Sequence, residues 1–269
     1  MAFVTCITTC KGRLDHLKVS LPRLMALADA EVVVVDYDCP QGTADWVAGA
    51  WPAARVVRAY DRPHFNLSKA RNLGAQVATS PWLLFVDADA PVAPTILDEV
   101  APLLEPGCYL VPEPRPWPLW GNMFVAAEDH RRIGGFDETF EGWGGEDQDY
   151  NDRLEMIGRR KGAFPLALLE SLQHTDERRT EFYALTDIPL NAAINSLYSD
   201  VKLDLMRQGL DLNAAARSTL YADVTRAVTE AGPNGPVRLQ VTFRDKVSGA
   251  RPLRSHLVYE LAPADLRKT

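Results

Sequence analysis

The feature that most constrains the fold is a series of short apolar runs that alternate with helix-like segments. Runs such as EVVVVD (31–36) and WLLFVDAD (82–89) are apolar at successive positions, not at every second one. Strands of this kind are buried on both faces, as in parallel sheets covered by helices. The expected strands are 3–8, 31–36, 55–59 and 82–89, and the expected helices are 13–29, 42–51, 67–78 and 95–104. The sequence therefore predicts an α/β fold with a mostly parallel central sheet and helices on both faces.

A loop and a further helix are expected after these elements. The proline-rich stretch PEPRPWP (112–118) predicts a loop, because proline interrupts helices and central strands. Apolar residues at positions 150, 154 and 157 predict a helix that begins near Gly145 or Glu146, and Gly158 is placed to end it.

The last third of the chain differs in character. We expect helices after about residue 175, including one over 213–231, and then a small hairpin with strands 237–245 and 251–261. The chain is therefore predicted to consist of a main domain, 1–180, and an appendage, 181–269.

Charge and cysteine content exclude several classes of protein. The net charge of −7 and the pI of about 5.3 argue against nucleic-acid binding and against a basic membrane-binding face. No apolar stretch reaches membrane-spanning length. The four cysteines form no CxxC pair and no zinc-type spacing, which favours a reducing compartment. We expect a cytoplasmic protein, with peripheral membrane association and the oligomeric state left open.

The predicted strand 82–89 ends in two aspartates. Asp87 and Asp89 are two residues apart, so on an extended chain they point the same way. Ligands of open parallel sheets bind beyond the carboxyl ends of the strands, and two carboxylates there favour a divalent cation that also binds phosphates. The alternative is a solvated turn with helix-capping aspartates.

Other charged residues also lie at the predicted ends of strands and helices, but their pattern is less specific. Asp36 and Asp38 repeat the aspartate pattern one strand earlier, where they could bind a base or ribose or could be turn residues. Lys69 and Arg71 begin a predicted helix, where helix N-termini attract phosphate, although basic residues on a helix are often a solvated face.

The run EGWGGEDQDYND (141–152) combines a tryptophan, two adjacent glycines and five acids. Acids in a first helical turn are favourable against the helix dipole, which is one explanation of the run. The dipole does not explain the preceding GWGG. Glycines allow close approach or positive φ, and Trp143 offers a flat face for a sugar or a base. Together with a carboxylate held by the helix, these residues predict a general-base site.

Taken in order, these motifs resemble those of the GT-A-type glycosyltransferases. Specifically, they resemble the β-1,4-galactosyltransferase-like and chondroitin-polymerase-like branch, which uses UDP-sugars and Mn²⁺. The resemblance covers about residues 3–180 and rests on FNLSKARNLG (65–74), the DxD motif of Asp87 and Asp89, DETFEGWGGEDQDYNDRL (137–154) and His174. GWGGED is the most specific of these motifs.

The resemblance implies a GT-A fold with a nucleotide-binding half, 1–90, and an acceptor half, 91–180. The residues implied on the nucleotide side are Thr9, Lys11, Arg13, Asp36, Asp38, Phe65, Lys69 and Asp87. Asp89 and His174 would bind Mn²⁺ or Mg²⁺, and Trp143, Gly144 and Gly145 would border the sugars. Glu146 would hold a sugar hydroxyl, and Asp147 would deprotonate the acceptor hydroxyl. The implied reaction is an inverting displacement from a UDP-sugar to a glycan or another hydroxyl acceptor.

Two alternatives to a glycosyltransferase follow from the same residues. LLFVDADAPV and GGEDQDYND imitate acidic motifs of haloacid-dehalogenase-type phosphatases, although more than 80 residues precede the first of them. A non-catalytic sugar-nucleotide-binding protein is the second alternative, and the presence of Asp89, Asp147 and His174 argues against it.

Overall fold

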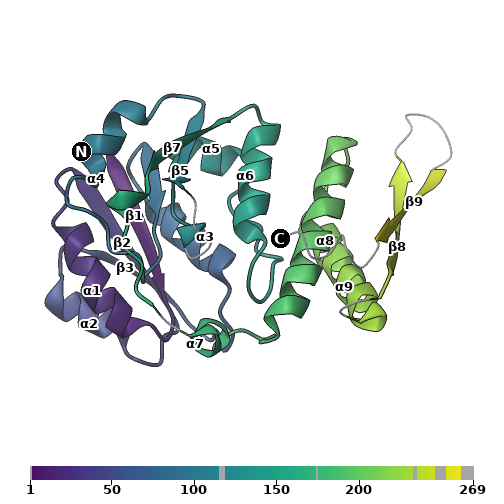
Figure 1. Cartoon of the computed structure of the whole chain (residues 1–269), viewed down its shortest axis with the longest axis horizontal. Coiled ribbons are helices and arrows are strands. Elements are labelled where there is room, and N and C mark those ends of the chain that lie inside the picture. The colour runs from purple at the N-terminus through teal and green to yellow at the C-terminus, as the bar shows by residue number, and fades with distance from the viewer. Residues whose placement is uncertain (1, 115–118, 174, 233–234, 246–252, 262–269) are drawn as a thin grey trace. The chain divides into compact units, whose positions relative to one another are not determined.

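The computed structural model describes residues 2–114, 119–173, 175–232, 235–245 and 253–261 (Figure 1). The chain forms two compact units: unit 1 comprises Met1–Glu138 and Asp147–Ala184, and unit 2 comprises Thr139–Glu146 and Leu185–Thr269. The second unit is therefore discontinuous in sequence, since a short segment before helix α6 belongs to it.

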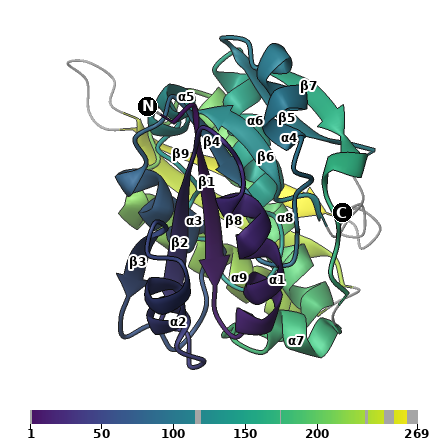
Figure 2. The ribbon, with the colours of Figure 1, turned by 90° about the vertical axis from the view of Figure 1, so that its left-hand side faces the viewer.

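Unit 1 is built on a seven-stranded sheet with the order β3-β2-β1-β4-β6-β5-β7. β1 pairs in parallel with β2 and β4, and Figure 2 shows β1 and β2 side by side. β6 is antiparallel to β4 and β5, whereas β7 is parallel to β5. The strands are β1 (Val4–Cys10), β2 (Ala30–Tyr37), β3 (Arg55–Ala59), β4 (Trp82–Phe85), β5 (Cys108–Glu113), β6 (Met123–Ala126) and β7 (Arg160–Pro165). The prediction of a mostly parallel sheet is confirmed.

Helices cover both faces of this sheet, as expected from strands that are apolar throughout. The buried side chains of α1, α2 and α4 pack on one apolar cluster with Cys6 and Val34, and those of α3 and α6 pack on another with Ile7 and Val35. The helices of unit 1 are α1 (Leu14–Met25), α2 (Thr43–Ala50), α3 (Leu67–Val77), α4 (Ile96–Val100), α5 (Ala127–Arg132), α6 (Glu146–Met156) and α7 (Asp176–Thr180), with 3-10 turns at Ala101–Leu103 and Leu166–Leu168.

The prediction that 112–118 is a loop is wrong at its start. β5 continues through Pro112 to Glu113 and pairs with β7 along this length. Its pairing with β6 involves only Leu110 and Phe124. Pro112 therefore lies where β5 has no β6 partner, and a missing N–H is tolerated on such a free side. Residues 115–118 lie outside the described residues.

Helix α6 begins at Glu146, as the sequence predicts. Tyr150 and Leu154 are both fully buried in the second cluster. Gly158 follows the helix with φ of 80°, and the N–H of Arg159 donates to the carbonyl of Leu154 at 3.0 Å. A glycine in this left-handed conformation ends the helix as expected.

Unit 2 contains two long helices and a hairpin. Helices α8 and α9 pack together around Ile194, Val201 and Val224. The elements are α8 (Ile188–Arg207), α9 (Ala214–Ala231), β8 (Val237–Asp245) and β9 (Leu253–Leu261), and β8 and β9 are antiparallel. No helix in the described part of the chain combines the length and apolar character that spanning a membrane requires.

The buried imidazole of His130 makes the stability of the fold depend on pH. Its Nδ1 lies 2.8 Å from the Tyr150 hydroxyl, and burial, together with Arg153 and Arg131, lowers its pKa from 6.5 to about 4. The unfolded chain therefore takes up a proton at a higher pH than the folded protein does. The contribution of neutral His130 to the stability of the folded protein is therefore complete above pH 6.5. It is lost as the pH falls to about 4.

Between these two pKa values, we expect protonation of His130 to lower the free energy of unfolding by about 3 kcal/mol, since one pKa unit corresponds to about 1.4 kcal/mol. Urea unfolding of the wild type and of His130→Gln at about pH 7 and about pH 4.5 tests this. The variant cannot take up the proton, so its stability should fall less over the same interval. Equal losses in both proteins would contradict the assignment.

Candidate active site

The carboxyl ends of the parallel strands bring the N-terminal motifs to one edge of the sheet. Thr9 lies near the end of β1, Asp36 lies in β2, and Asp87 follows β4. β1 lies between β2 and β4, and all three strands run in the same direction. This is the edge at which ligands of open α/β sheets bind.

Arg71 of α3 lies at the centre of this edge. Its side chain is 2% exposed, and its Nη1 donates to Oδ1 of Asp147 at 2.5 Å. Its Nη2 donates to Oδ1 of Asp87 at 3.0 Å and to the carbonyl of Gly121 at 3.2 Å. The guanidinium also lies over the ring of Phe136, 5.0 Å from its centroid. The predicted donor-side and acceptor-side carboxylates therefore meet at one buried cation.

This arrangement differs from the expected role of Arg71. The sequence predicts a phosphate-binding residue at the start of α3, whereas the guanidinium pairs with two carboxylates. The N-cap of α3 is Asn66, whose side chain accepts the N–H of Lys69. Lys69 itself is more exposed, and its Nζ lies 3.9 Å from Glu138.

The two aspartates of the DxD motif bind different arginines. Burial raises the pKa of Asp87, and the Asp89 and Asp147 carboxylates raise it further while Arg71 lowers it. Asp89 accepts a hydrogen bond from Nη1 of Arg13 at 2.8 Å. The expectation of an extended chain here is wrong, since the N–H of Ala90 donates to the carbonyl of Asp87 at 3.0 Å and closes a turn.

The expected metal site is described only in part. Asp89 lies at the sheet edge, but His174 lies outside the described residues. Among the side chains that the structure describes, no three His, Cys, Asp or Glu residues form a group that could hold a metal ion. The predicted metal-binding motif is therefore described at this sheet edge only through its two aspartates, Asp87 and Asp89.

Lys11 lies at the same edge but is saturated by the protein. Its Nζ donates to the carbonyls of Tyr37, Asp38 and Arg62 at 3.2, 3.0 and 2.6 Å. An ammonium group has three N–H donors, so these carbonyls use all of them. In this structure Lys11 joins the loops after β2 and β3, and does not present a donor for a diphosphate.

Asp36 and Asp38 likewise bind backbone groups. The two carboxylate oxygens of Asp36 accept the N–H groups of Cys39 and Ala44, each at 2.7 Å. Asp38 has φ of 54° and accepts the N–H of Arg62 at 3.0 Å. These contacts match the turn-residue alternative for both aspartates.

An aromatic contact at this edge was not anticipated from the sequence. A Cβ at Gly12, which has φ of 71°, would overlap the ring of Phe182. The carbonyl of Phe182 accepts the N–H of Phe65 at 2.7 Å, and the Phe65 ring contacts Tyr37 and Tyr183 with centroids 5.5 and 5.7 Å apart. Only the presence of Gly12 in TTCKGRLD hints at such a close approach.

The loop before Asp147 belongs to unit 2. Gly144 and Gly145 have φ of 89° and 91°, which confirms the prediction that glycines here allow positive φ. A Cβ at Gly145 would lie 2.9 Å from Cβ of Asn195, so its close approach is to helix α8 of the same unit. Trp143 and Gly144 contribute carbonyls that accept from Asn195, and Glu146 opens α6.

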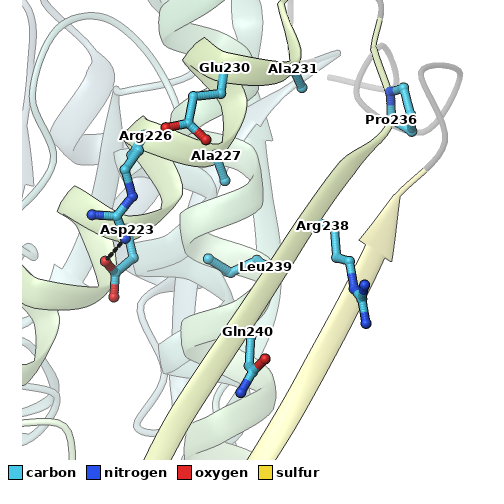
Figure 3. A pocket seen from close by; sticks show the side chains of 9 residues that line it. All are labelled: Asp223, Arg226, Ala227, Glu230, Ala231, Pro236, Arg238, Leu239 and Gln240. Carbon is cyan, nitrogen blue, oxygen red and sulfur yellow. Dashed lines mark hydrogen bonds and ion pairs between the residues drawn. The ribbon is translucent and has the colours of Figure 1, made fainter.

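Unit 2 also contains a cavity away from the sequence motifs. It has a volume of about 430 Å³ and lies between α9 and β8 (Figure 3). Its wall is polar, and Arg226 within it pairs with Asp223 at 2.5 Å. The lining residues are Asp223, Arg226, Ala227, Glu230, Ala231, Pro236, Arg238, Leu239 and Gln240.

Two family profiles match successive parts of the chain. Residues 5–114 match "Glycosyl transferase family 2", and residues 116–181 match "N-terminal domain of galactosyltransferase". Both matches support a GT-A-type glycosyltransferase. The DxD motif lies within the first match and GWGGED within the second, which argues against the phosphatase alternative.

The GT-A fold recurs in solved structures. A mannosyltransferase from Pyrobaculum calidifontis, in complex with GDP-Man and Mn²⁺, superposes with a TM-score of 0.59 and 20% identity over 86% of this chain and 76% of its own. Staphylococcus aureus TarS in complex with UDP-GlcNAc also gives 0.59, with 15% identity over 82% of this chain and 71% of its own. At these identities the likeness concerns the fold.

Curated relatives cover less of the chain. Validoxylamine A glucosyltransferase of Streptomyces hygroscopicus subsp. jinggangensis (strain 5008) is 28% identical over 193 residues, covering 49% of this chain and 46% of the relative. The same-named protein of subsp. limoneus is 27% identical over 190 residues, with 48% and 42% covered. The chain thus spans less than half the length of these relatives.

Gly121→Ala tests the packing around Arg71. The new Cβ would overlap Nη2 of Arg71 and lie 3.1 Å from Oδ2 of Asp147, so the guanidinium must move. We expect a loss of about 1–3 kcal/mol in the free energy of unfolding, as for overpacking elsewhere. Urea unfolding measures it.

Gly49→Ala is the matched control for this substitution. Gly49 lies in α2 with open space around its Cβ position, so alanine should be neutral or stabilising by up to about 1 kcal/mol. Equal effects of the two substitutions would show that Gly121 is not required by Arg71.

Proposed function

We propose that this chain is a metal-dependent, inverting glycosyltransferase that moves a sugar from a UDP-sugar to an acceptor hydroxyl. The observation that carries the proposal is the convergence of Asp87 and Asp147 on Arg71 at the carboxyl-end edge of the sheet. In a chain of the GT-A family, this convergence links a donor-side motif to an acceptor-side motif.

Asp147 is the proposed general base. Arg71 binds its Oδ1, and the side chain remains 18% exposed, which leaves the carboxylate accessible to an acceptor hydroxyl. The hydroxyl oxygen would form a bond to the anomeric carbon as the bond from that carbon to UDP breaks, and the hydroxyl proton would pass to Asp147. Arg71 would orient this carboxylate while Glu146 holds a sugar hydroxyl beside the Trp143 platform.

The donor set of the DxD turn fits a hard divalent cation, because its carboxylate oxygens are the ligands that Mg²⁺ and Mn²⁺ prefer. Asp89, with His174, would hold the cation, whose charge would stabilise the diphosphate leaving group. Asp89 accepts a hydrogen bond from Arg13, so the guanidinium and a bound cation would share this carboxylate. Mn²⁺ in the mannosyltransferase structure supports the choice of a divalent cation.

The comparisons support the choice of the first probes. UDP-GlcNAc in the TarS structure favours a UDP-sugar, and the names of the curated relatives favour a glucosyl donor and validoxylamine A as the acceptor. We therefore choose UDP-glucose as the first donor probe and validoxylamine A as the first acceptor probe.

A screen of UDP-sugars with Mn²⁺ tests the function. We expect hydrolysis of at least one donor, loss of hydrolysis with EDTA, and faster turnover when an accepted hydroxyl compound is added. If UDP with Mn²⁺ raises the melting temperature but no donor is ever hydrolysed or transferred, the chain is a non-catalytic sugar-nucleotide-binding protein and the proposal fails.

Asp147→Asn tests the proposed base. The amide keeps the shape of the carboxylate but cannot accept the hydroxyl proton, so transfer should fall by about 10²–10⁴-fold. Binding of UDP, measured by calorimetry with Mn²⁺, should change little.

Asp152→Asn is the control, because it makes the same change within α6 at a residue that pairs with Gln148. Retained transfer in Asp147→Asn, or loss of UDP binding together with transfer, would rule out Asp147 as the base.

A further inference from the structure

The loop that carries GWGG is held by side chains from the part of the chain beyond both profile matches. The matches end at residue 181, whereas α8 and α9 lie between Ile188 and Ala231. Within unit 2, residues 139–146 contact both helices, through Asn195 of α8 and Tyr221 of α9.

Asn195 forms the centre of this contact. Its side-chain amide is fully buried, and its Nδ2 lies within hydrogen-bond distance of the carbonyls of Glu141, Trp143 and Gly144, at 3.0, 3.4 and 2.7 Å. One amide group therefore fixes the course of the backbone on both sides of Gly142.

Tyr221 completes the contact from the neighbouring helix. Its hydroxyl accepts the N–H of Glu141 at 3.3 Å and lies 2.8 Å from Oδ1 of Asn195 and 3.2 Å from the Glu141 carbonyl. Burial raises the pKa of Tyr221, so the hydroxyl keeps its proton and remains able to donate. Asn195 is thus oriented so that its Nδ2, not its Oδ1, faces the loop carbonyls.

The glycines of the loop fit the same support. Gly142 has φ of 70°, and a Cβ there would overlap Oδ1 of Asn191. Asn191 in turn donates from Nδ2 to the carbonyl of Leu185 at 2.7 Å. Phe140, at the start of the loop, packs on Tyr198 with ring centroids 5.1 Å apart and lies under Nζ of Lys202 at 5.0 Å. The loop is therefore positioned along its whole length by residues of α8 and α9.

We infer that Asn195 and Tyr221 are positioning residues for the acceptor-side loop, and that α8 and α9 form its structural support. This inference rests on the proposed function in reading residues 141–146 as acceptor-side. It assigns the helices beyond the profile matches to acceptor binding and not to donor binding.

Hydrogen–deuterium exchange of the full chain tests the positioning directly. We expect exchange in peptides covering residues 139–146 to become at least about tenfold faster in Tyr221→Phe and in Asn195→Asp, since each removes hydrogen bonds that order the loop. Asn195→Asp replaces the donor with a carboxylate facing three carbonyls, so its effect should be the larger.

Two controls make the same changes elsewhere in unit 2. Tyr259→Phe removes a hydroxyl that donates to Asp204 at 2.7 Å, and Asn213→Asp keeps an acceptor at the N-cap of α9. Neither control should alter exchange over 139–146. Unchanged loop exchange in both Tyr221→Phe and Asn195→Asp would overturn the inference, as would equal acceleration in the controls.

Activity separates a positioning role from a general loss of stability. With the UDP-sugar and acceptor probes of the screen, Tyr221→Phe should lower transfer at least about tenfold while donor hydrolysis stays within about twofold. A parallel fall of both rates would contradict the assignment to acceptor binding. If the wild type hydrolyses no donor, the proposed function fails, and the exchange measurement still decides whether Asn195 and Tyr221 order the loop.

Discussion

A buried guanidinium that binds two carboxylates is the interaction on which the organisation of this sheet edge depends. Moving an unpaired cation out of water costs several kcal/mol, so the position of Arg71 requires Asp87 and Asp147 nearby. Asp87 follows β4 and Asp147 lies in the first turn of α6, so this requirement fixes a loop after a strand against the start of a helix. Gly121 and the face of Phe136 complete the surroundings, the first by lacking a side chain and the second by its π system.

The sheet could be predicted because the burial of a strand determines which types of residue it contains. Strands covered on both faces have no exposed side, so β2 and β4 contain continuous apolar runs, and β1 combines apolar residues with buried threonines. β5 was harder to predict because Pro112 lies within it, and a proline is compatible with a strand only where one side lacks a partner. Which side of a strand lacks a partner depends on neighbours distant in sequence, and a local pattern does not contain that information.

The candidate site shows the same division between local and distant information. Residue types and their order indicated Asp87, Asp89 and Asp147, because carboxylates at strand ends and helix starts are local features. The partners of the basic residues were not predictable in the same way. Arg71 lies 76 positions from Asp147, and Lys11 lies 51 positions from the Arg62 carbonyl that it binds. The charges of these side chains are known from the sequence, but which oxygen each charged group binds depends on how the loops fold.

The discontinuity of unit 2 has a consequence for the history of the chain. A domain formed by one continuous segment of the chain can be gained or lost in a single fusion event at a terminus. This unit instead includes residues 139–146, which lie between two segments of unit 1. Any ancestor that lacked residues 185–269 must have ordered the GWGG loop with other side chains, or left it without support. Substitutions in the loop and in α8 and α9 are therefore expected to have accumulated together, as compensating changes on two sides of one packed surface.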